Sequence, residues 1–230
     1  MSCVFLLGEI KTGILLQGRV SKWTIPIIEE FQINFPNSEI LLSTWNTENI
    51  DGIPCKVIQN SLPAPTSPYL STKNYQILGC RMGLKEMDAD IILKGRSDQF
   101  IHNPKIFEVF LNENSYDKIM YPHLGIKKGV KDYWIEDFCQ ISSKKTLLDF
   151  WNNMPYDDGK HEVAVEIYLT KNYVLKTKKD SSPWTQIKQK YFIPKGYHEI
   201  FQIEWEKIAN IEHYRRTLFR ESVENYELSG

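Results

Sequence analysis

The sequence predicts an α/β domain built on an open, mostly parallel sheet with helices on both faces. Across residues 13–122, short apolar segments that fit strands alternate with longer segments of helical periodicity. Residues 91–93 are wholly apolar, which is typical of a strand buried on both faces. With 230 residues, 42% of them hydrophobic, the chain can enclose such a core as a single domain over residues 1–230. We expect an α/β half over residues 1–122 and an α+β extension over residues 123–230 that closes over the sheet's edge.

The first half opens with a strand, a helix and a second strand. Residues 13–18, "GILLQG", are an apolar run closed by glycine, and residues 38–45, "SEILLSTW", form the next strand. Between them we expect a helix with Thr24 as its N-cap and Pro26 in its first turn. A short strand at residues 55–60 follows, and this order of elements favours parallel pairing.

The rest of the first half continues this alternation. Three prolines make residues 61–69 an extended loop. We then expect a helix at residues 71–87 and the buried strand in "ADIILKGRSD", residues 89–98, which ends in a cluster of charge. A helix at residues 103–114 and a strand at residues 116–122 complete the half.

The second half is less regular. The elements expected there are a Gly/Lys-rich loop at residues 123–133, a strand at 134–142, and helices at 144–154, 162–174 and 198–219.

Charge and cysteine content exclude several classes of protein. The 28 Lys and Arg residues nearly balance the 29 Asp and Glu residues, so the chain has no overall attraction for nucleic acid or an anionic membrane. The four cysteines form no C-x-x-C pair, which favours a reducing compartment. The apolar run at residues 4–7 is too short for a signal peptide or a membrane span. We expect a cytoplasmic protein that binds no nucleic acid; peripheral association with the inner face of the membrane stays open.

Aspartates lie on both sides of the strand at residues 91–93. In open α/β sheets, ligands bind outside the carboxyl ends of the strands. Asp88 and Asp90 precede the strand, so we expect them to be solvated at its amino end, away from the ligand site. Lys94, Arg96 and Asp98 follow it. They form either a local ion-pair cluster, or a site in which Asp98 ligates a divalent cation while a basic neighbour meets a phosphate.

Polar residues also end the first two strands. Gln17, Gly18, Arg19 and Ser21 stand where the first strand meets its helix, a place that suits an anion, although a plain strand–turn–helix junction is the alternative. The turn has neither G-x-x-x-x-G-K-[ST] nor G-x-G-x-x-G, so it is no P-loop and no dinucleotide fingerprint. The second strand ends in "STWN", residues 43–46, which adds a third polar tip to the same edge.

Five segments in order, "LLQGRV", "FPNSEILLSTW", "NYQILGCRMGL", "ILKGRSDQF" and "WIEDFCQIS", resemble the WavE family of lipopolysaccharide-synthesis proteins. The resemblance spans roughly residues 13–170. Proteins of that family look like glycosyltransferases of the glycosyltransferase-A fold. The resemblance implies transfer of a sugar from a nucleoside-diphosphate donor to a saccharide or lipid-linked saccharide acceptor, in the synthesis of bacterial lipopolysaccharide or capsule. Residues 1–122 would bind the nucleotide, and residues 123–230 the acceptor.

The same resemblance implies the site residues. Those facing the nucleotide would be Gln17, Gly18, Arg19, Thr44, Trp45, Asn74, Gln76, Lys94, Arg96 and Asp98. Asp98 would be the ligand of Mn²⁺ or Mg²⁺, because the K-x-R-x-D segment takes the place of the metal-binding D-x-D motif. Arg96 stands where the first aspartate of that motif would be, so neutralisation of the diphosphate by Arg96 and Lys94 without a metal is the alternative.

Transfer with inversion also requires a carboxylate that removes the proton of the acceptor hydroxyl. Asp137 is the first candidate and Glu166 the second; each could instead have no catalytic role, Glu166 as a solvated helix position. Two other functions compete. A sugar nucleotidyltransferase would need a Gly-rich loop after the first strand, which this sequence lacks. A non-catalytic sugar-nucleotide-binding or scaffolding protein would keep the binding edge without a working base.

Overall fold

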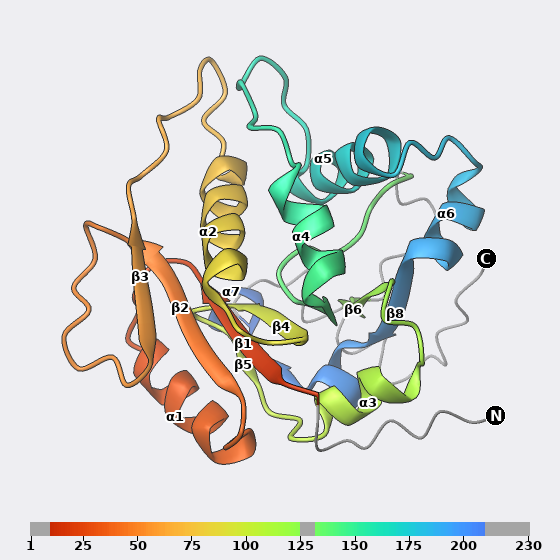
Figure 1. The fold of residues 1–230 in the computed structure, drawn as a ribbon. Helices are drawn as coiled ribbons and strands as arrows, with labels where there is room; N and C mark the ends of the chain where they lie inside the picture. Colours follow the sequence, from red (N-terminus) through yellow and green to blue (C-terminus); the bar gives the residue numbers. More distant parts are fainter. Residues whose placement is uncertain (1–9, 125–131, 210–230) are drawn as a thin grey trace.

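The computed structural model describes residues 10–124 and 132–209, and its centre is a seven-stranded sheet (Figure 1). The strands lie in the order β3-β2-β1-β4-β7-β6-β8. They are β1 Thr12–Gln17, β2 Glu39–Trp45, β3 Lys56–Asn60, β4 Ile91–Arg96, β6 Ile119–His123, β7 Gln140–Ser143 and β8 Phe192–Gly196. Four of the six pairings are parallel, which confirms the predicted open, mostly parallel sheet.

Parallel pairing brings the carboxyl ends of β1, β2 and β4 to one edge. Gln17, the last residue of β1, is the register partner of Ser43 in β2 and of Arg96 in β4. Asp90 directly precedes β4, and Asp88 is 90% exposed and pairs with Lys11 before β1. The two early aspartates therefore lie at the amino ends of the strands, as expected.

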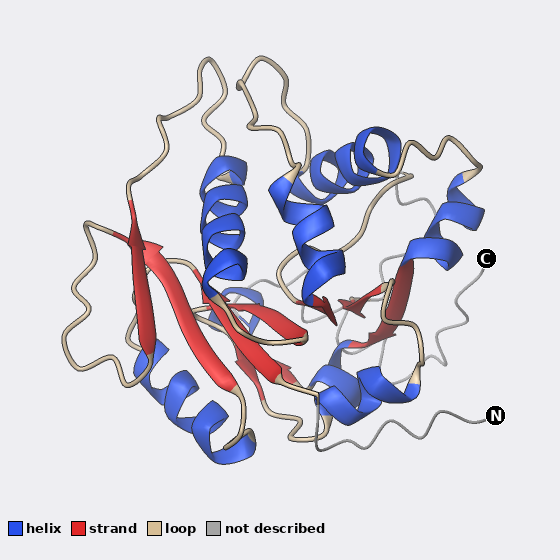
Figure 2. Ribbon diagram, viewed as in Figure 1, coloured by secondary structure: helices blue, strands red, loops and turns tan. Residues whose placement is uncertain are grey.

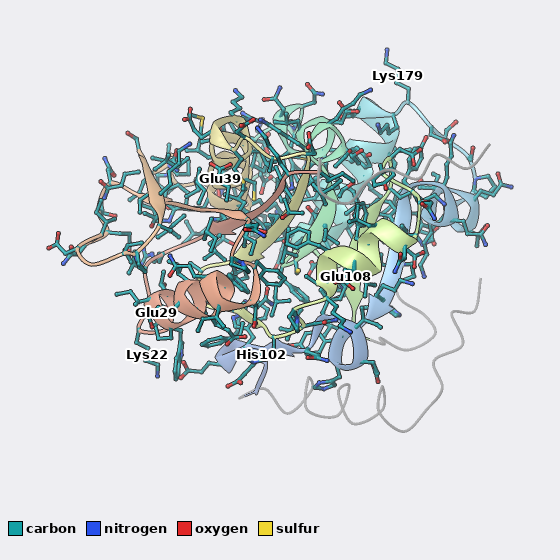
Figure 3. The ribbon with its side chains drawn as sticks, turned by 60° about the horizontal axis from the view of Figure 1, so that its bottom comes forward. Lys22, Glu29, Glu39, His102, Glu108 and Lys179 are labelled. Carbon is teal, nitrogen blue, oxygen red and sulfur yellow. The ribbon has the colours of Figure 1, made fainter. Side chains whose placement is uncertain are left out.

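Helices cover both faces of the sheet, as predicted (Figure 2). On one face lie α1, Thr24–Asn34, and α3, Ile106–Asn112; on the other lie α2, Lys73–Glu86, and α4, Lys144–Asn152. Charged residues of these helices, among them Glu29, point outward (Figure 3).

The two faces of β1 serve different cores. Leu16 belongs to the apolar cluster that contains Phe31 of α1, whereas Leu15 belongs to the cluster that contains Leu84 of α2. All four side chains are fully buried. Burying a leucine or phenylalanine side chain stabilises a fold by about 1.5–3 kcal/mol. The apolar clusters on the two faces of β1 therefore fix the position of the sheet edge formed by the carboxyl ends of the strands.

The second half does not simply close over the sheet; it supplies part of it. β7 lies between β4 and β6 and is antiparallel to both, and β8 forms the edge beside β6. After α4, this half continues with α5 Val165–Lys171, which runs into a π-helical turn, η1 Asn172–Thr177, and then with α6 Trp184–Tyr191.

The strand expected at residues 134–142 is shorter than predicted. Only Gln140–Ser143 pairs as β7, and residues 134–139 run as irregular backbone beside the strand ends. The apolar residues Ile135 and Phe138 are buried there, but through side-chain packing. Their apolar character correctly indicated burial, but these residues do not form a strand.

The long helix expected at residues 198–219 is wrong over its described part. Gln202 has a left-handed backbone, with φ of 52°, and separates a π-helical turn, η2 Tyr197–Phe201, from a short strand, β9 Ile203–Glu204. β9 pairs antiparallel with β5, Phe100–Ile101, and α7 covers Glu206–Ala209. Residues 210–219 lie outside the described residues, as do residues 125–131 of the expected Gly/Lys-rich loop.

One helix cap also differs. Trp23, not Thr24, is the N-cap of α1. Thr24 Oγ1 accepts a hydrogen bond from Ser21 N and donates one to Ser97 O, so this hydroxyl ties the start of α1 to the tip of β4.

Within residues 10–124 and 132–209, no helix has both the length and the apolar character needed to cross a membrane.

Candidate functional site

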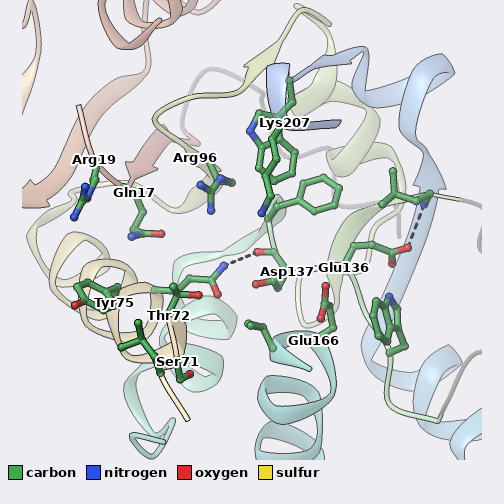
Figure 4. Close-up of a pocket in the computed structure, with 18 of the residues that line it drawn as sticks. Gln17, Arg19, Ser71, Thr72, Tyr75, Arg96, Glu136, Asp137, Glu166 and Lys207 are labelled. Carbon is green, nitrogen blue, oxygen red and sulfur yellow. Dashed lines mark hydrogen bonds between the residues drawn. The ribbon is translucent and has the colours of Figure 1, made fainter. Parts of the chain in front are cut away.

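The carboxyl ends of β1, β2 and β4 open into a pocket of about 440 Å³ (Figure 4). Its other walls are the start of α2, the loop at residues 134–138, the first turn of α5, and two residues from the segment 203–207, which we call the C-terminal strap. The pocket lies at the edge where open α/β sheets bind ligands.

Gly18 makes the turn at the tip of β1 possible. Its φ is +144°, and a Cβ atom there would collide with the side chain of Ser97 at the tip of β4. Ser97 Oγ instead donates a hydrogen bond to Arg19 O, and Gly18 N donates one to Ser43 O. Because glycine alone allows this close approach without strain, Gly18 fixes the backbone that carries Gln17 and Arg19 to the pocket.

One side of the pocket is basic. Arg96 Nε lies 2.9 Å from Asp98 Oδ1, and Arg96 Nη2 lies 3.3 Å from Asp98 Oδ2. Its guanidinium carbon lies 4.9 Å from the ring centroid of Trp205, and Lys207 Nζ lies 5.3 Å from the same centroid. Arg19, whose side chain is 77% exposed, adds a third cation at the mouth.

The other side is acidic. Glu136, Asp137 and Glu166 line it, and in Figure 4 they lie below Arg96 and Lys207. Burial raises the pKa of Glu166 to about 7, and the negative charge of Asp137 adds to that effect. Glu136 is buried and accepts a hydrogen bond from Leu124 N, so its role is to hold the chain after β6.

Two residues hold the backbone of Asp137. Its main-chain carbonyl accepts hydrogen bonds from Lys94 Nζ at 2.7 Å and from Gln76 Nε2 at 3.4 Å. Lys94 is fully buried, and its Nζ lies 5.2 Å from the ring centroid of Trp151. This support replaces the strand ladder that the loop lacks and presents Asp137 to the pocket.

Eight of the twelve residues proposed from the sequence line the pocket: Gln17, Gly18, Arg19, Trp45, Gln76, Arg96, Asp137 and Glu166. Glu166, which could have been a solvated helix position, is instead half-buried there.

Four proposed residues lie outside the pocket lining. Thr44 is fully buried between two strand neighbours. Asn74 exchanges two hydrogen bonds with the backbone of Asp157 and so holds a loop. Lys94 supports Asp137 from behind, and Asp98 holds Arg96.

Several lining residues were missed in the sequence: Tyr75, Trp134, Glu136, Trp205 and Lys207. Glu136 could have been found, because it directly precedes Asp137. Ile203 and Trp205 are buried and alternate with exposed Glu204 and Glu206 in "IEWEK", a strand-like pattern that the helical periodicity around it concealed.

The residues around Asp98 do not fit the divalent cation expected there. Both carboxylate oxygens of Asp98 accept hydrogen bonds from Arg96. Across the part of the chain that the structure describes, no group of three or more His, Cys, Asp or Glu residues is arranged to hold a metal ion. A cation at Asp98 would first have to displace a guanidinium.

Solved structures show which fold this is. Glucosyl-3-phosphoglycerate synthase from Mycobacterium tuberculosis, solved with Mn²⁺, UDP and phosphoglyceric acid, is 12% identical with a TM-score of 0.51; the match covers 83% of this chain and 69% of that one. 4-Diphosphocytidyl-2C-methyl-D-erythritol synthase from Anaerococcus prevotii is 12% identical with a TM-score of 0.50; the match covers 94% of this chain and 98% of that one. The likeness confirms the predicted glycosyltransferase-A-like fold, which glycosyltransferases and nucleotidyltransferases share.

Residues 1–349 of TarS from S. aureus are also similar, at 12% identity and a TM-score of 0.46; the match covers 72% of this chain and only 56% of the TarS chain. No curated protein gives a significant match. Residues 15–182 match the family described as WavE lipopolysaccharide synthesis, and that match includes the end of β1, all of β2 to β4, the loop at residues 134–138 and Glu166. The chain therefore belongs to the WavE lipopolysaccharide synthesis family.

Proposed function

We propose that this protein is a glycosyltransferase that moves a sugar from a nucleoside-diphosphate donor to a hydroxyl group of a saccharide acceptor, free or lipid-linked, in the synthesis of a bacterial surface polysaccharide. The observation that carries the proposal is the division of charge in the pocket, with Arg19, Arg96 and Lys207 on one side and Asp137 and Glu166 on the other. Membership of the WavE family and the glycosyltransferase-A-like fold support it.

The basic side of the pocket suits the leaving diphosphate, and the acidic side suits the acceptor hydroxyl group. The bond between the anomeric carbon and the diphosphate oxygen breaks, and its electron pair leaves with the diphosphate. Fixed positive charges stabilise that leaving group more than they stabilise the intact donor, which lowers the barrier. The acceptor's oxygen forms the new bond to the anomeric carbon, and its proton passes to a carboxylate on the acidic side.

Glu166 is our first choice for that carboxylate. A general base works best when its pKa lies near the working pH, and the pKa of Glu166 is raised to about 7. The neighbouring Asp137 contributes to that shift through its charge, so we assign it a supporting role. This reverses the order in which the sequence ranked them.

Trp45 and Tyr75 provide a wall for the nucleoside. They pack edge to face, with ring centroids 5.4 Å apart, and line the pocket beside the tips of β1 and β2. Aromatic rings with this packing offer a rigid apolar surface against which a base can stack. Gln17 and Gln76 add amide groups that can hydrogen-bond the donor.

The experiment is a donor and acceptor screen with the purified chain. UDP-, GDP-, CDP- and dTDP-sugars are each incubated with saccharide acceptors, and release of the nucleoside diphosphate is measured. Acceptor-dependent release by the wild type, with strong loss in Glu166→Gln and none in Lys85→Ala, supports the proposal. Lys85 is exposed in the last turn of α2, away from the pocket.

Other outcomes would indicate the competing functions. Release of pyrophosphate from a nucleoside triphosphate and a sugar 1-phosphate would identify a nucleotidyltransferase. Tight binding of a nucleotide sugar without turnover by any acceptor would identify a binding protein.

A further inference from the structure

We infer that the donor's diphosphate is held without a metal ion by a basic clamp, which consists of Arg96 and Lys207 on the indole of Trp205, with Asp98 positioning Arg96. This inference rests on the proposed function and adds how the anionic part of the donor is bound.

Arg96 is held rigidly at the tip of β4. Asp98 accepts two hydrogen bonds from its guanidinium, and the indole of Trp205 lies 4.9 Å from the guanidinium carbon. Both charged side chains are about one-third exposed, at 30% and 31%. A paired and stacked guanidinium has fixed donor directions, so its remaining N–H groups are preorganised for a phosphate. The same pairing occupies the oxygens that a cation would need.

Lys207 reaches the pocket because the C-terminal strap is anchored along its length. Its first residues, Ile203 and Glu204, pair with Ile101 and Phe100 as β9 and β5. Farther along, Glu206 Oε2 accepts a hydrogen bond from Trp23 Nε1 at 2.7 Å. These contacts fix the backbone on both sides of Trp205, so a residue distant in sequence becomes a wall of the nucleotide pocket.

Lys207 supplies net positive charge that Arg96 does not. Asp98 offsets the charge of Arg96 in an ion pair. Within the described residues no carboxylate lies within ion-pair distance of Lys207; its Nζ lies 5.3 Å from the ring centroid of Trp205, and its charge partly opposes the rise in the pKa of Glu166. A cation that no carboxylate contacts directly can turn to an anionic ligand at the wall of a pocket. Loss of Lys207 should therefore weaken diphosphate binding strongly.

Trp205 gives this wall of the pocket a buried aromatic ring. Its side chain is only 7% exposed and lines the pocket, yet its Nε1 has no hydrogen-bond acceptor among the described residues. This N–H group is shielded from solvent, so Trp205 offers the pocket its ring, beside which Arg96 and Lys207 lie.

The test is calorimetric titration of the full chain with UDP, GDP, CDP and dTDP, each in EDTA and again in Mn²⁺. We expect at least one of them to bind with comparable affinity in both buffers. Lys207→Ala should lower that affinity about 10- to 100-fold, the usual effect of losing a charged hydrogen bond. Lys207→Arg, which keeps the charge, should lose less, and Lys85→Ala should match the wild type.

Binding that requires Mn²⁺ would overturn the clamp and leave the proposed function standing, with a metal as the partner of the diphosphate. Unchanged affinity in Lys207→Ala, with Mn²⁺ or without it, would also overturn the clamp alone. If no nucleoside diphosphate binds in either buffer, both the clamp and the proposed function fail. Thermal unfolding of each variant confirms that a lost affinity does not come from a lost fold.

Discussion

Asp137 and Glu166, from a loop and a helix 29 positions apart in the chain, face the same pocket, where the charge of Asp137 raises the pKa of Glu166. Burial contributes more to this shift than Asp137 does. Two carboxylates that share a pocket cannot both ionise freely, and such pairs are common where proton transfer occurs.

The pair predicts the pH dependence of transfer. Because the pKa of Glu166 is raised to about 7, its basic form is lost as the pH falls below that value, and kcat/KM should fall with it. Asp137→Asn removes the neighbouring charge while keeping the size and the main-chain carbonyl contacts, so the acidic limb should move to lower pH. The measurement is a pH–rate profile of both proteins. An acidic limb at the same pH in both would mean that Asp137 does not act on Glu166.

Glu166 should also lower the stability of the fold at high pH. A carboxyl whose pKa is raised on folding binds more protons in the folded state, so the free energy of unfolding decreases as the pH rises from the unfolded pKa of 4.5 toward 7. Glu166→Gln removes this effect and should stabilise the protein by about 1–3 kcal/mol at pH 8, with a smaller gain at pH 5.

Thermal unfolding at the two pH values measures the gain. A variant less stable than the wild type at pH 8 would contradict it and would show that the ionised carboxylate has stabilising partners. A variant that unfolds at a higher temperature yet transfers no sugar would place Glu166 in the chemistry rather than in the fold.

The sequence was sufficient to predict the edge at which the site lies. Apolar runs ending at Gln17 and Arg96 indicated two buried strands, and parallel pairing makes their ends neighbours whatever the details of the helices. The location of Asp88 and Asp90 at the opposite edge followed from the same rule.

Contacts between distant segments could not be predicted in this way. Ile203 and Glu204 become a strand only because β5 offers an unpaired edge, and local helical periodicity in their neighbourhood gave no sign of it. The ion pair between Arg96 and Asp98 was one of the two alternatives that their spacing allowed. The packing of Arg96 and Lys207 on Trp205 depends on a contact between distant segments, which spacing does not reveal.

Arg96→Lys tests whether guanidinium geometry matters beyond charge. Lysine keeps the positive charge but cannot form the two parallel bonds to Asp98 or stack as a plane on Trp205. We expect the affinity for the nucleoside diphosphate to fall about tenfold, measured by calorimetric titration in EDTA. Equal affinities would mean that Arg96 acts only as a point charge and that Asp98 has no positioning role.

A buried ion pair, Lys73–Asp157, joins the start of α2 to the loop at residues 153–164 beside the pocket. Lys73 Nζ lies 2.8 Å from Asp157 Oδ2, and each side chain is 6% exposed. The loops at residues 61–72 and 153–164 stand together at the top of Figure 1, where Tyr69 N donates to Gly159 O. Ser71 and Thr72, next to Lys73, line the pocket, so this pair holds one of its walls.

Removal of one charge from that pair should destabilise the protein strongly. Asp157→Asn leaves the Lys73 ammonium buried without a countercharge, which costs about 3–5 kcal/mol. Asp158→Asn is the matched control: the next residue pairs with Lys160, but the two side chains are 58% and 72% exposed, and exposed pairs contribute about 0–1 kcal/mol. Urea unfolding of the three proteins gives the free energies. Similar small losses in both variants would mean that water reaches Lys73, and that the wall formed by these loops opens readily in solution.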